Sequence, residues 1–243
     1  MVWLRKLFFL FLIFSSTSSS ALSYYFIFLG PPGSGKSTQT FLLEKKHNMP
    51  HICVGDLLRK EVASASKEGN KIREYMDRGQ MVPENLALPL LWKELNNKFC
   101  EKGCILDGTS RSLSHAKALI QHLPKDSCIV AIFLSLPQNK IIHRIQNRLY
   151  CEGCGKTYDL LIAPPLNDGV CDFCNKSLTH RKDDDKSVFI HRLSLYQKNE
   201  QEVLSFYKTI NILVEVNGDL SVSAVAKRIE EIIQNSCCFL KNK

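Results

Sequence analysis

Near its N-terminal end the chain has an apolar run that leads directly into a glycine-rich segment, and this junction narrows the possible folds. Residues 24–29 read YYFIFL, and residues 30–38 read GPPGSGKST. A short, continuous apolar run predicts a strand buried on both faces of a parallel sheet. The segment after it fits the pattern G-x-x-x-x-G-K-[ST], whose backbone N–H groups turn inward around phosphate oxygens. Strand, loop and a following helix over 37–46 together predict a site for nucleotide phosphates.

Each part of this loop has a predicted role. Lys36 reaches the β- and γ-phosphates, and a hydroxyl of Ser37 or Thr38 approaches Mg²⁺. The helix over 37–46 directs its N-terminus at the same anion. The residues predicted to bind the donor phosphates are Gly33, Ser34, Gly35, Lys36, Ser37 and Thr38. The loop does not by itself separate a kinase from a GTPase or an ATPase.

Composition excludes several other classes of protein. Of 243 residues, 44% are hydrophobic and 23% charged, which is typical of a folded globular chain rather than a disordered one. A single strongly apolar stretch lies at the N-terminus, so a membrane protein with several spans is excluded. The net charge of +8 is compatible with nucleic-acid binding, a basic tail or a polyphosphate site.

The first residues have the form of a targeting segment. Residues 1–14 read MVWLRKLFFLFLIF and are followed by SSTSSSALS. A charged start, a short apolar core and small polar residues are typical of a secretory signal. A mitochondrial presequence, an uncleaved anchor and a wrongly chosen start codon are the alternatives. We expect residues 1–22 to direct the chain to the secretory pathway or an organelle (plastid-like or mitochondrial) rather than leave it in the cytoplasm. Contact with a membrane is expected only through this segment, if it is uncleaved.

Four cysteines have the spacing of a metal site. The pattern C-x₂-C-x₁₆-C-x₂-C is formed by Cys151, Cys154, Cys171 and Cys174. Four thiolates close a tetrahedral zinc site and leave no open position, so the predicted zinc is structural. Two disulfides are the alternative if the N-terminal segment delivers the chain to an oxidising compartment. A nucleic-acid-binding zinc ribbon is disfavoured, because residues 155–170 contain one lysine and no arginine.

Further motifs follow the phosphate loop in a fixed order. They are HICVGDLLR at 51–59, GQMVP at 79–83, ILDG at 105–108 with Arg111, the pair Arg144 and Arg148, RKDD at 181–184, and RLSLY at 192–196. With these motifs, the chain over 24–233 resembles adenylate kinases that carry a long, zinc-binding lid. The resemblance implies an α/β fold of the P-loop NTPase type, with a parallel five-stranded sheet flanked by helices. It also implies a helical monophosphate-binding insertion at 53–82 and a small zinc lid at 149–186. The core would comprise 23–52, 83–148 and 187–233, followed by a basic tail at 234–243.

The resemblance also implies an activity and a set of site residues. The reaction is reversible, Mg-dependent phosphoryl transfer from ATP to AMP, giving two ADP, by a monomer that does not bind nucleic acid. Such transfer needs charge neutralised on the phosphate oxygens. The implied catalytic residues are Lys36, Arg111, Arg148, Arg181 and Arg192. Arg144, Arg148 and Leu220 join the loop in binding ATP, and AMP would contact Val54, Arg59, Met81, Val82, Gly108, Arg111, His115, Arg181 and Arg192. Asp107 and Ser37 would hold Mg²⁺ through water, and Asp183 and Asp184 would orient the arginines at the lid hinge.

The departures from the family pattern cluster on the acceptor side. The family usually has threonine at the position of Val54, phenylalanine and proline at Thr109 and Ser110, and glutamine at His115, where it reads the adenine edge. These changes predict a phosphotransferase whose acceptor preference is loosened or changed, with AMP as the first choice. Another acceptor nucleotide, GTP as the donor, and a non-catalytic nucleotide sensor are the alternatives.

Overall fold

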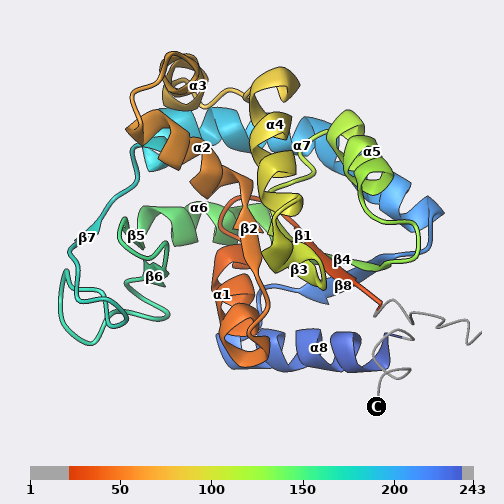
Figure 1. The fold of residues 1–243 in the computed structure, drawn as a ribbon. Helices are drawn as coiled ribbons and strands as arrows, with labels where there is room; N and C mark the ends of the chain where they lie inside the picture. The colour runs from red at the N-terminus through yellow and green to blue at the C-terminus, as the bar shows by residue number, and fades with distance from the viewer. Residues whose placement is uncertain (1–21, 237–243) are drawn as a thin grey trace, which may run out of the picture.

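The computed structural model describes residues 22–236 and contains a central sheet of five parallel strands (Figure 1). The strands are arranged in the order β2-β3-β1-β4-β8. Their bounds are β1 (Tyr24–Leu29), β2 (His51–Cys53), β3 (Gly103–Asp107), β4 (Cys128–Ser135) and β8 (Leu213–Asn217). The predicted fold class is therefore confirmed, and β1 coincides with the apolar run. The predicted targeting segment lies outside the described residues apart from Leu22, as do residues 237–243 of the predicted tail.

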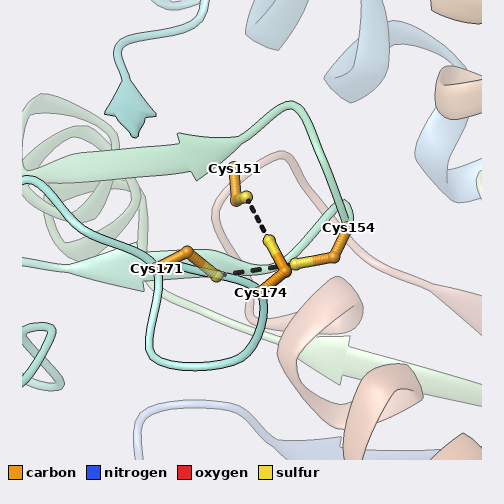
Figure 2. Close-up of side chains that lie close together, drawn as sticks. All are labelled: Cys151, Cys154, Cys171 and Cys174. Carbon is orange, nitrogen blue, oxygen red and sulfur yellow. Dashed lines mark hydrogen bonds between the residues drawn. The ribbon is translucent and has the colours of Figure 1, made fainter. Parts of the chain in front are cut away.

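Two smaller units are added to this core. The segment predicted as the insertion folds into α2 (Val54–Ala63) and α3 (Lys67–Asp77). The segment predicted as the lid forms an antiparallel sheet in the order β6-β5-β7, with bounds Arg148–Cys151 for β5, Thr157–Asp159 for β6 and Leu178–Thr179 for β7. The four motif cysteines lie together in this unit (Figure 2). Its apolar cluster is small and includes two of those cysteines, so the unit has little core of its own.

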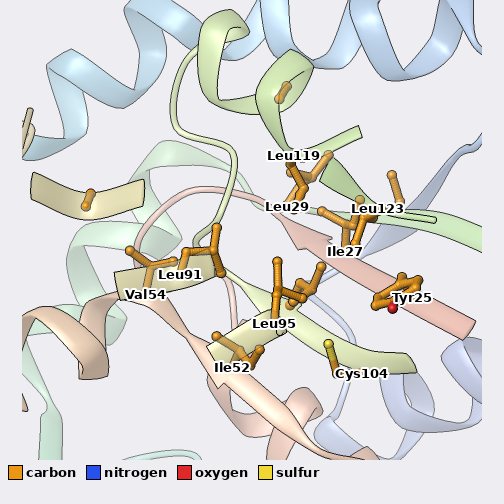
Figure 3. Close-up of a cluster of buried hydrophobic side chains, with 14 of the residues drawn as sticks. Tyr25, Ile27, Leu29, Ile52, Val54, Leu91, Leu95, Cys104, Leu119 and Leu123 are labelled. Carbon is orange, nitrogen blue, oxygen red and sulfur yellow. The ribbon is translucent and has the colours of Figure 1, made fainter. Parts of the chain in front are cut away.

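Helices cover both faces of the central sheet. Successive side chains of β1 point to opposite faces, so this strand contributes to an apolar core on each face. Phe26 and Phe28 pack with Leu43 of α1 and Ile229 of α8 on one face. On the other face, β1 residues such as Ile27 pack against α4, α5 and α7 (Figure 3). The covering helices are α1 (Lys36–His47), α4 (Glu84–Leu95), α5 (Leu113–His122), α7 (Lys186–Thr209) and α8 (Val222–Asn235). The 3₁₀ turns η1 (Lys98–Cys100) and η2 (Lys182–Asp184) and helix α6 (Gln138–Gln146) complete the described chain.

The parallel arrangement places several loops at one edge of the sheet. The segments after β1, β3, β4 and β8 all leave from the carboxyl ends of their strands. In open α/β sheets this edge is where ligands bind. Across the described residues, no helix combines the length and the apolar character that a membrane span requires.

Candidate active site

The phosphate loop follows the central strand β1 and depends on two glycines. Gly30 approaches the neighbouring strand so closely that an added Cβ would lie 2.6 Å from the carbonyl oxygen of Leu134. Gly35 has φ of +96° where α1 begins, a conformation that favours glycine. The loop therefore turns sharply enough to present its backbone N–H groups and the N-terminus of α1 to one space.

Lys36 extends across this loop from the first turn of α1. Its Nζ donates hydrogen bonds to the carbonyl oxygens of Gly30, at 2.8 Å, and Pro31, at 2.9 Å. Burial in the cleft lowers the pKa of Lys36 to about 8, although the nearby Asp107 carboxylate acts in the opposite direction. The ammonium group is thus held at the loop in an environment that would favour a neighbouring anion.

Asp107 and Ser37, the two residues predicted to hold Mg²⁺, lie next to each other. Asp107 is the last residue of β3 and only 3% exposed, and the Ser37 hydroxyl donates to its Oδ2 at 3.0 Å. The pair offers hydroxyl and carboxylate oxygens beside the phosphate loop. Such oxygens are the ligands that Mg²⁺ prefers, directly or through water. The donor set fits the predicted ion.

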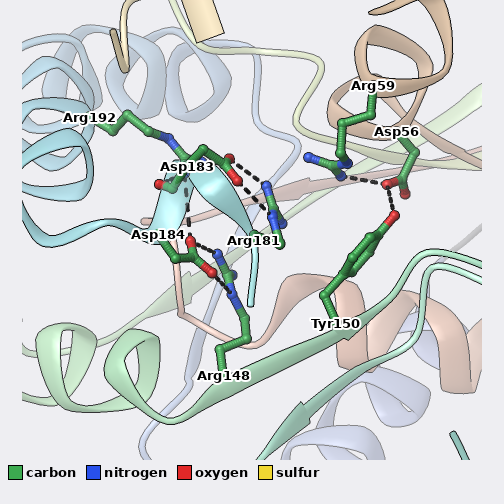
Figure 4. A network of polar contacts seen from close by, with 8 residues as sticks. All are labelled: Asp56, Arg59, Arg148, Tyr150, Arg181, Asp183, Asp184 and Arg192. Atoms are coloured by element: carbon green, nitrogen blue, oxygen red, sulfur yellow. Dashed lines mark hydrogen bonds and ion pairs between the residues drawn. The ribbon is translucent and has the colours of Figure 1, made fainter. Parts of the chain in front are cut away.

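Three predicted arginines form ion pairs with the two predicted hinge carboxylates (Figure 4). Arg148 donates to both carboxylate oxygens of Asp184, with Nε at 2.8 Å from Oδ2. Arg181 donates to both oxygens of Asp183, at 2.9 and 2.6 Å. Arg192 Nη1 lies 2.7 Å from Asp183 Oδ2 and donates to the Asp183 carbonyl oxygen at 2.8 Å. Burial opposes the ionisation of Asp183, but Arg181 and Arg192 outweigh it and hold its pKa well below the usual range.

Two cavities meet at the arginines. The larger has a volume of about 250 Å³ and is lined by the phosphate loop, and the smaller has a volume of about 50 Å³. Four predicted arginines line both cavities: Arg59, Arg111, Arg181 and Arg192. Within the described part of the chain, no carboxylate forms an ion pair with Arg111. A group that bridged the two cavities would therefore contact guanidinium groups contributed by α2, the segment after β3, the lid and α7.

The larger cavity also collects the other predicted donor-side residues. Arg144 on α6 lines it and donates to the carbonyl oxygen of Gly218 at 2.9 Å. Leu220, in the turn after β8, lines it as well and is 47% exposed. The loop residues from Gly33 to Thr38 and Arg148 complete this group. Their roles as nucleotide ligands stay predictions.

The smaller cavity contains the residues predicted for the acceptor, including those that depart from the family pattern. It is lined by Val54, Arg59, Met81, Val82, Gly108, Thr109, Arg111 and His115, among others. His115 Nε2 and Thr109 Oγ1 are buried and have no hydrogen-bond partner among the described residues. Burial lowers the pKa of His115, so the ring is neutral near pH 7. Both residues thus line the cavity and carry a buried polar atom without a hydrogen bond, and Glu84 Oε1 lies 3.7 Å from His115 Nε2.

The four cysteine sulfurs converge in a second candidate site. All four Sγ atoms lie within 4.8 Å of one another, with Cys151 and Cys174 separated by 3.3 Å and Cys154 and Cys171 by 3.5 Å. A disulfide bond measures about 2.05 Å, whereas a tetrahedral site with Zn–S bonds of about 2.3 Å needs sulfurs farther apart. The arrangement is compatible with zinc.

The backbone repeats the same turn around each cysteine pair. The N–H of Gly155 donates to the carbonyl oxygen of Cys151 at 2.9 Å, and the N–H of Asn175 donates to that of Cys171 at 2.9 Å. Gly155 and Asn175 both adopt positive φ, at +76° and +59°. Each C-x-x-C segment is thus a tight turn that directs two sulfurs to one point.

Sequence patterns missed two contacts at the site. Tyr150 of β5 donates to Asp56 of α2 at 3.2 Å, and the hydroxyl of Ser110 lies 2.6 Å from that of Tyr207. Tyr150 is adjacent to the first motif cysteine, but no motif marks it as a site residue. Ser110 stood out only as a departure from the family pattern.

The chain is similar to known adenylate kinases over most of its length. A family model described as adenylate kinase matches residues 28–212. The protein named adenylate kinase from Thermosipho africanus is 40% identical over 211 residues, covering 86% of this chain and 98% of that protein. Proteins of the same name from Archaeoglobus fulgidus and Clostridium tetani are 37% and 35% identical, covering 86% and 85% of this chain and 97% of each relative.

Proposed function

Because the chain belongs to the adenylate kinase family, we propose that it transfers a phosphoryl group reversibly from Mg·ATP to AMP, giving two molecules of ADP. The observation that carries this proposal is the set of arginines shared by the two cavities. A donor triphosphate in the larger cavity and an acceptor monophosphate in the smaller one would meet at that boundary. Phosphoryl transfer depends on positioning and charge neutralisation at such a meeting point.

The residues divide into three roles. The loop N–H groups and Lys36 hold the donor, while Arg59 and Arg111 hold the acceptor phosphate. Arg148, Arg181 and Arg192 stabilise the charge that develops during in-line transfer. No covalent intermediate with the protein is needed, because the acceptor phosphate attacks directly. Closure of the lid and insertion excludes water, which would otherwise compete as the acceptor.

Two metal ions have separate tasks. Asp107 and Ser37 are the residues that would hold the Mg²⁺ that accompanies ATP, and the bound ion would neutralise charge on the phosphate oxygens. The four cysteines would hold a zinc ion whose role would be structural. The zinc stabilises a unit whose apolar cluster is small.

The acceptor is AMP in this proposal. His115 and Thr109 support a base with a polar edge, because both line the smaller cavity and each has a buried polar atom without a hydrogen bond. Either side chain can donate or accept a hydrogen bond. These two side chains do not distinguish adenine from other bases. We therefore choose AMP over other monophosphates because the chain belongs to the adenylate kinase family.

The test is phosphotransfer by the purified protein with Mg·ATP and AMP, GMP, CMP or UMP offered in turn. Turnover is expected with AMP and reduced about 100-fold in Arg111→Lys, which loses a bidentate phosphate contact. The matched control is Arg228→Lys on α8, whose guanidinium pairs at the surface with Glu231 alone among the described residues and which should retain full activity. Turnover with another acceptor alone would refute the AMP assignment. Absence of turnover with all four monophosphates would refute phosphotransferase activity and favour a non-catalytic nucleotide sensor.

A further inference from the structure

Tyr150 joins the lid to the monophosphate insertion. It lies on β5 and is only 9% exposed. Its hydroxyl donates a hydrogen bond to Oδ1 of Asp56 on α2, at 3.2 Å, across 94 residues of chain (Figure 4). The same carboxylate accepts a hydrogen bond from Arg59, so Asp56 is bonded at once to the lid and to a predicted acceptor ligand.

The ring of Tyr150 contacts two of the shared arginines. The guanidinium carbon of Arg59 lies 5.3 Å from the ring centroid, and that of Arg181 lies 5.6 Å from it. Both distances are within the range in which an aromatic ring attracts a cation. One side chain thus contacts an arginine from the insertion and an arginine from the lid, and both arginines line both cavities.

A second part of the lid also approaches Asp56. A Cβ added to Gly155, in the first cysteine turn, would lie 3.7 Å from Asp56 Oδ2. Burial raises the pKa of Tyr150 and the Asp56 carboxylate acts in the same direction, so the hydroxyl remains a donor at neutral pH. Arg59 holds the pKa of Asp56 below its usual range despite burial, so the acceptor remains ionised. The junction is therefore a hydrogen bond to a charged acceptor, which is stronger than one between neutral groups.

We propose that Tyr150 is a positioning residue that couples closure of the lid to closure of the insertion, so that each nucleotide raises the affinity for the other. The proposal rests on the function above, in which Arg59 binds the acceptor and the lid binds the donor. A donor that draws the lid inward carries Tyr150 towards Asp56 and thereby orders α2 around the acceptor. Such coupling is reciprocal by thermodynamic necessity.

The experiment measures binding without turnover in the full chain. The dissociation constant of AMP is measured by calorimetry alone and again with a saturating Mg complex of β,γ-imido-ATP, and the ratio of the two constants is the coupling factor. We expect a factor well above 1 in the wild type and a factor closer to 1 in Tyr150→Phe, because one lost hydrogen bond to a charged group can lower the factor by as much as about 10- to 100-fold. Tyr150→Leu, which also removes the ring, should lower the factor further.

Tyr158→Phe is the matched control, since Tyr158 is also a lid tyrosine. Its hydroxyl accepts from the N–H of Asp172 at 2.9 Å and lies 3.4 Å from Cys171 Sγ, so its hydrogen bonds among the described residues stay within the lid. Tyr158 also lines the larger cavity, but the donor analogue is saturating when AMP binding is measured. This variant should keep the wild-type coupling factor, and all variants should retain their bound metal. An unchanged factor in Tyr150→Phe, an equal decrease in Tyr158→Phe, or a wild-type factor of 1 would each overturn the inference. If phosphotransfer itself persists in those cases, the proposed function stands without it.

Discussion

The hydroxyl groups of Ser110 and Tyr207 lie 2.6 Å apart in the protein interior, although 97 residues separate them in the chain. Ser110 directly precedes Arg111 in the segment between β3 and α5, and Tyr207 is fully buried on α7. The bond therefore ties the segment that carries Arg111 to a long helix on one face of the sheet.

Breaking this bond should destabilise the fold. Ser110→Ala and Tyr207→Phe should each lower the free energy of unfolding by about 1–3 kcal/mol, because the remaining hydroxyl is left buried without its partner. The double variant should lose less than the sum, since neither hydroxyl then remains. Urea unfolding of the wild type, the two single variants and the double variant measures these losses. Strictly additive losses in the free energy of unfolding would contradict an energetic link between the two hydroxyls.

The lowered pKa of Lys36 predicts that ATP binding takes up protons. With a pKa of about 8, Lys36 loses charge as the pH rises through 8, whereas bound phosphates would raise that pKa again. ATP affinity should therefore fall above pH 8. Calorimetry of ATP binding at about pH 8.5, in two buffers of different ionisation enthalpy, should detect the uptake of less than one proton per ATP bound. Lys36→Met should abolish this uptake, and equal uptake in both proteins would assign it to another group.

An aromatic contact between the second cysteine turn and α1 should stabilise the lid in its observed position. The rings of Phe173 and Phe41 meet edge to face with centroids 5.4 Å apart, and Lys45 Nζ lies 4.8 Å from the Phe173 centroid. Phe173→Ala should raise the KM for ATP about 2- to 10-fold through loss of the aromatic pair. Leu166→Ala is the control, because Leu166 is an apolar lid residue that is 87% exposed. Equal effects of the two variants would show that the aromatic pair has no specific role.

Removal of the predicted zinc should unfold the lid before the core. A thiol reagent that modifies the cysteine cluster should release one zinc per chain, detected with a metallochromic dye. Cys151→Ser should lose the metal and about 10-fold or more in activity, because the lid has little apolar core without it. Cys100→Ala, outside the cluster and buried beside the sheet, should keep the metal. Purified protein that is free of zinc but contains two disulfides in the lid would favour the alternative reading of the spacing.

Local patterns in the sequence predict much of the fold. The apolar run of β1 ends where the phosphate loop begins, so the sequence predicts both the first and the last residue of the strand. The C-x-x-C spacing likewise anticipates the convergence of the four sulfurs, because each tight turn is built within five residues. These features depend on neighbours in the chain.

The features that escape prediction depend on distant residues. β2 has three residues and β7 has two, which is too short for a hydrophobic period to be recognised. The contact of Tyr150 with Asp56 exists only after the lid has been placed against α2. No spacing rule relates residues 94 positions apart, so the sequence predicts candidate ligands but not the contacts between separate units of the fold.

The ion pairs made by Asp183 and Asp184 also determine which edge of each arginine is available. Arg148 and Arg181 each use Nε and Nη2 on a carboxylate, and Arg192 uses Nη1. Three guanidinium groups and two carboxylates give this cluster a net charge of only +1, although the chain as a whole carries +8. The cluster is therefore expected to recognise an anion through the direction of its hydrogen-bond donors more than through its net charge. A phosphate whose oxygens reach the unpaired N–H groups of these arginines would accept aligned hydrogen bonds. An anion that does not reach those groups would be bound only weakly.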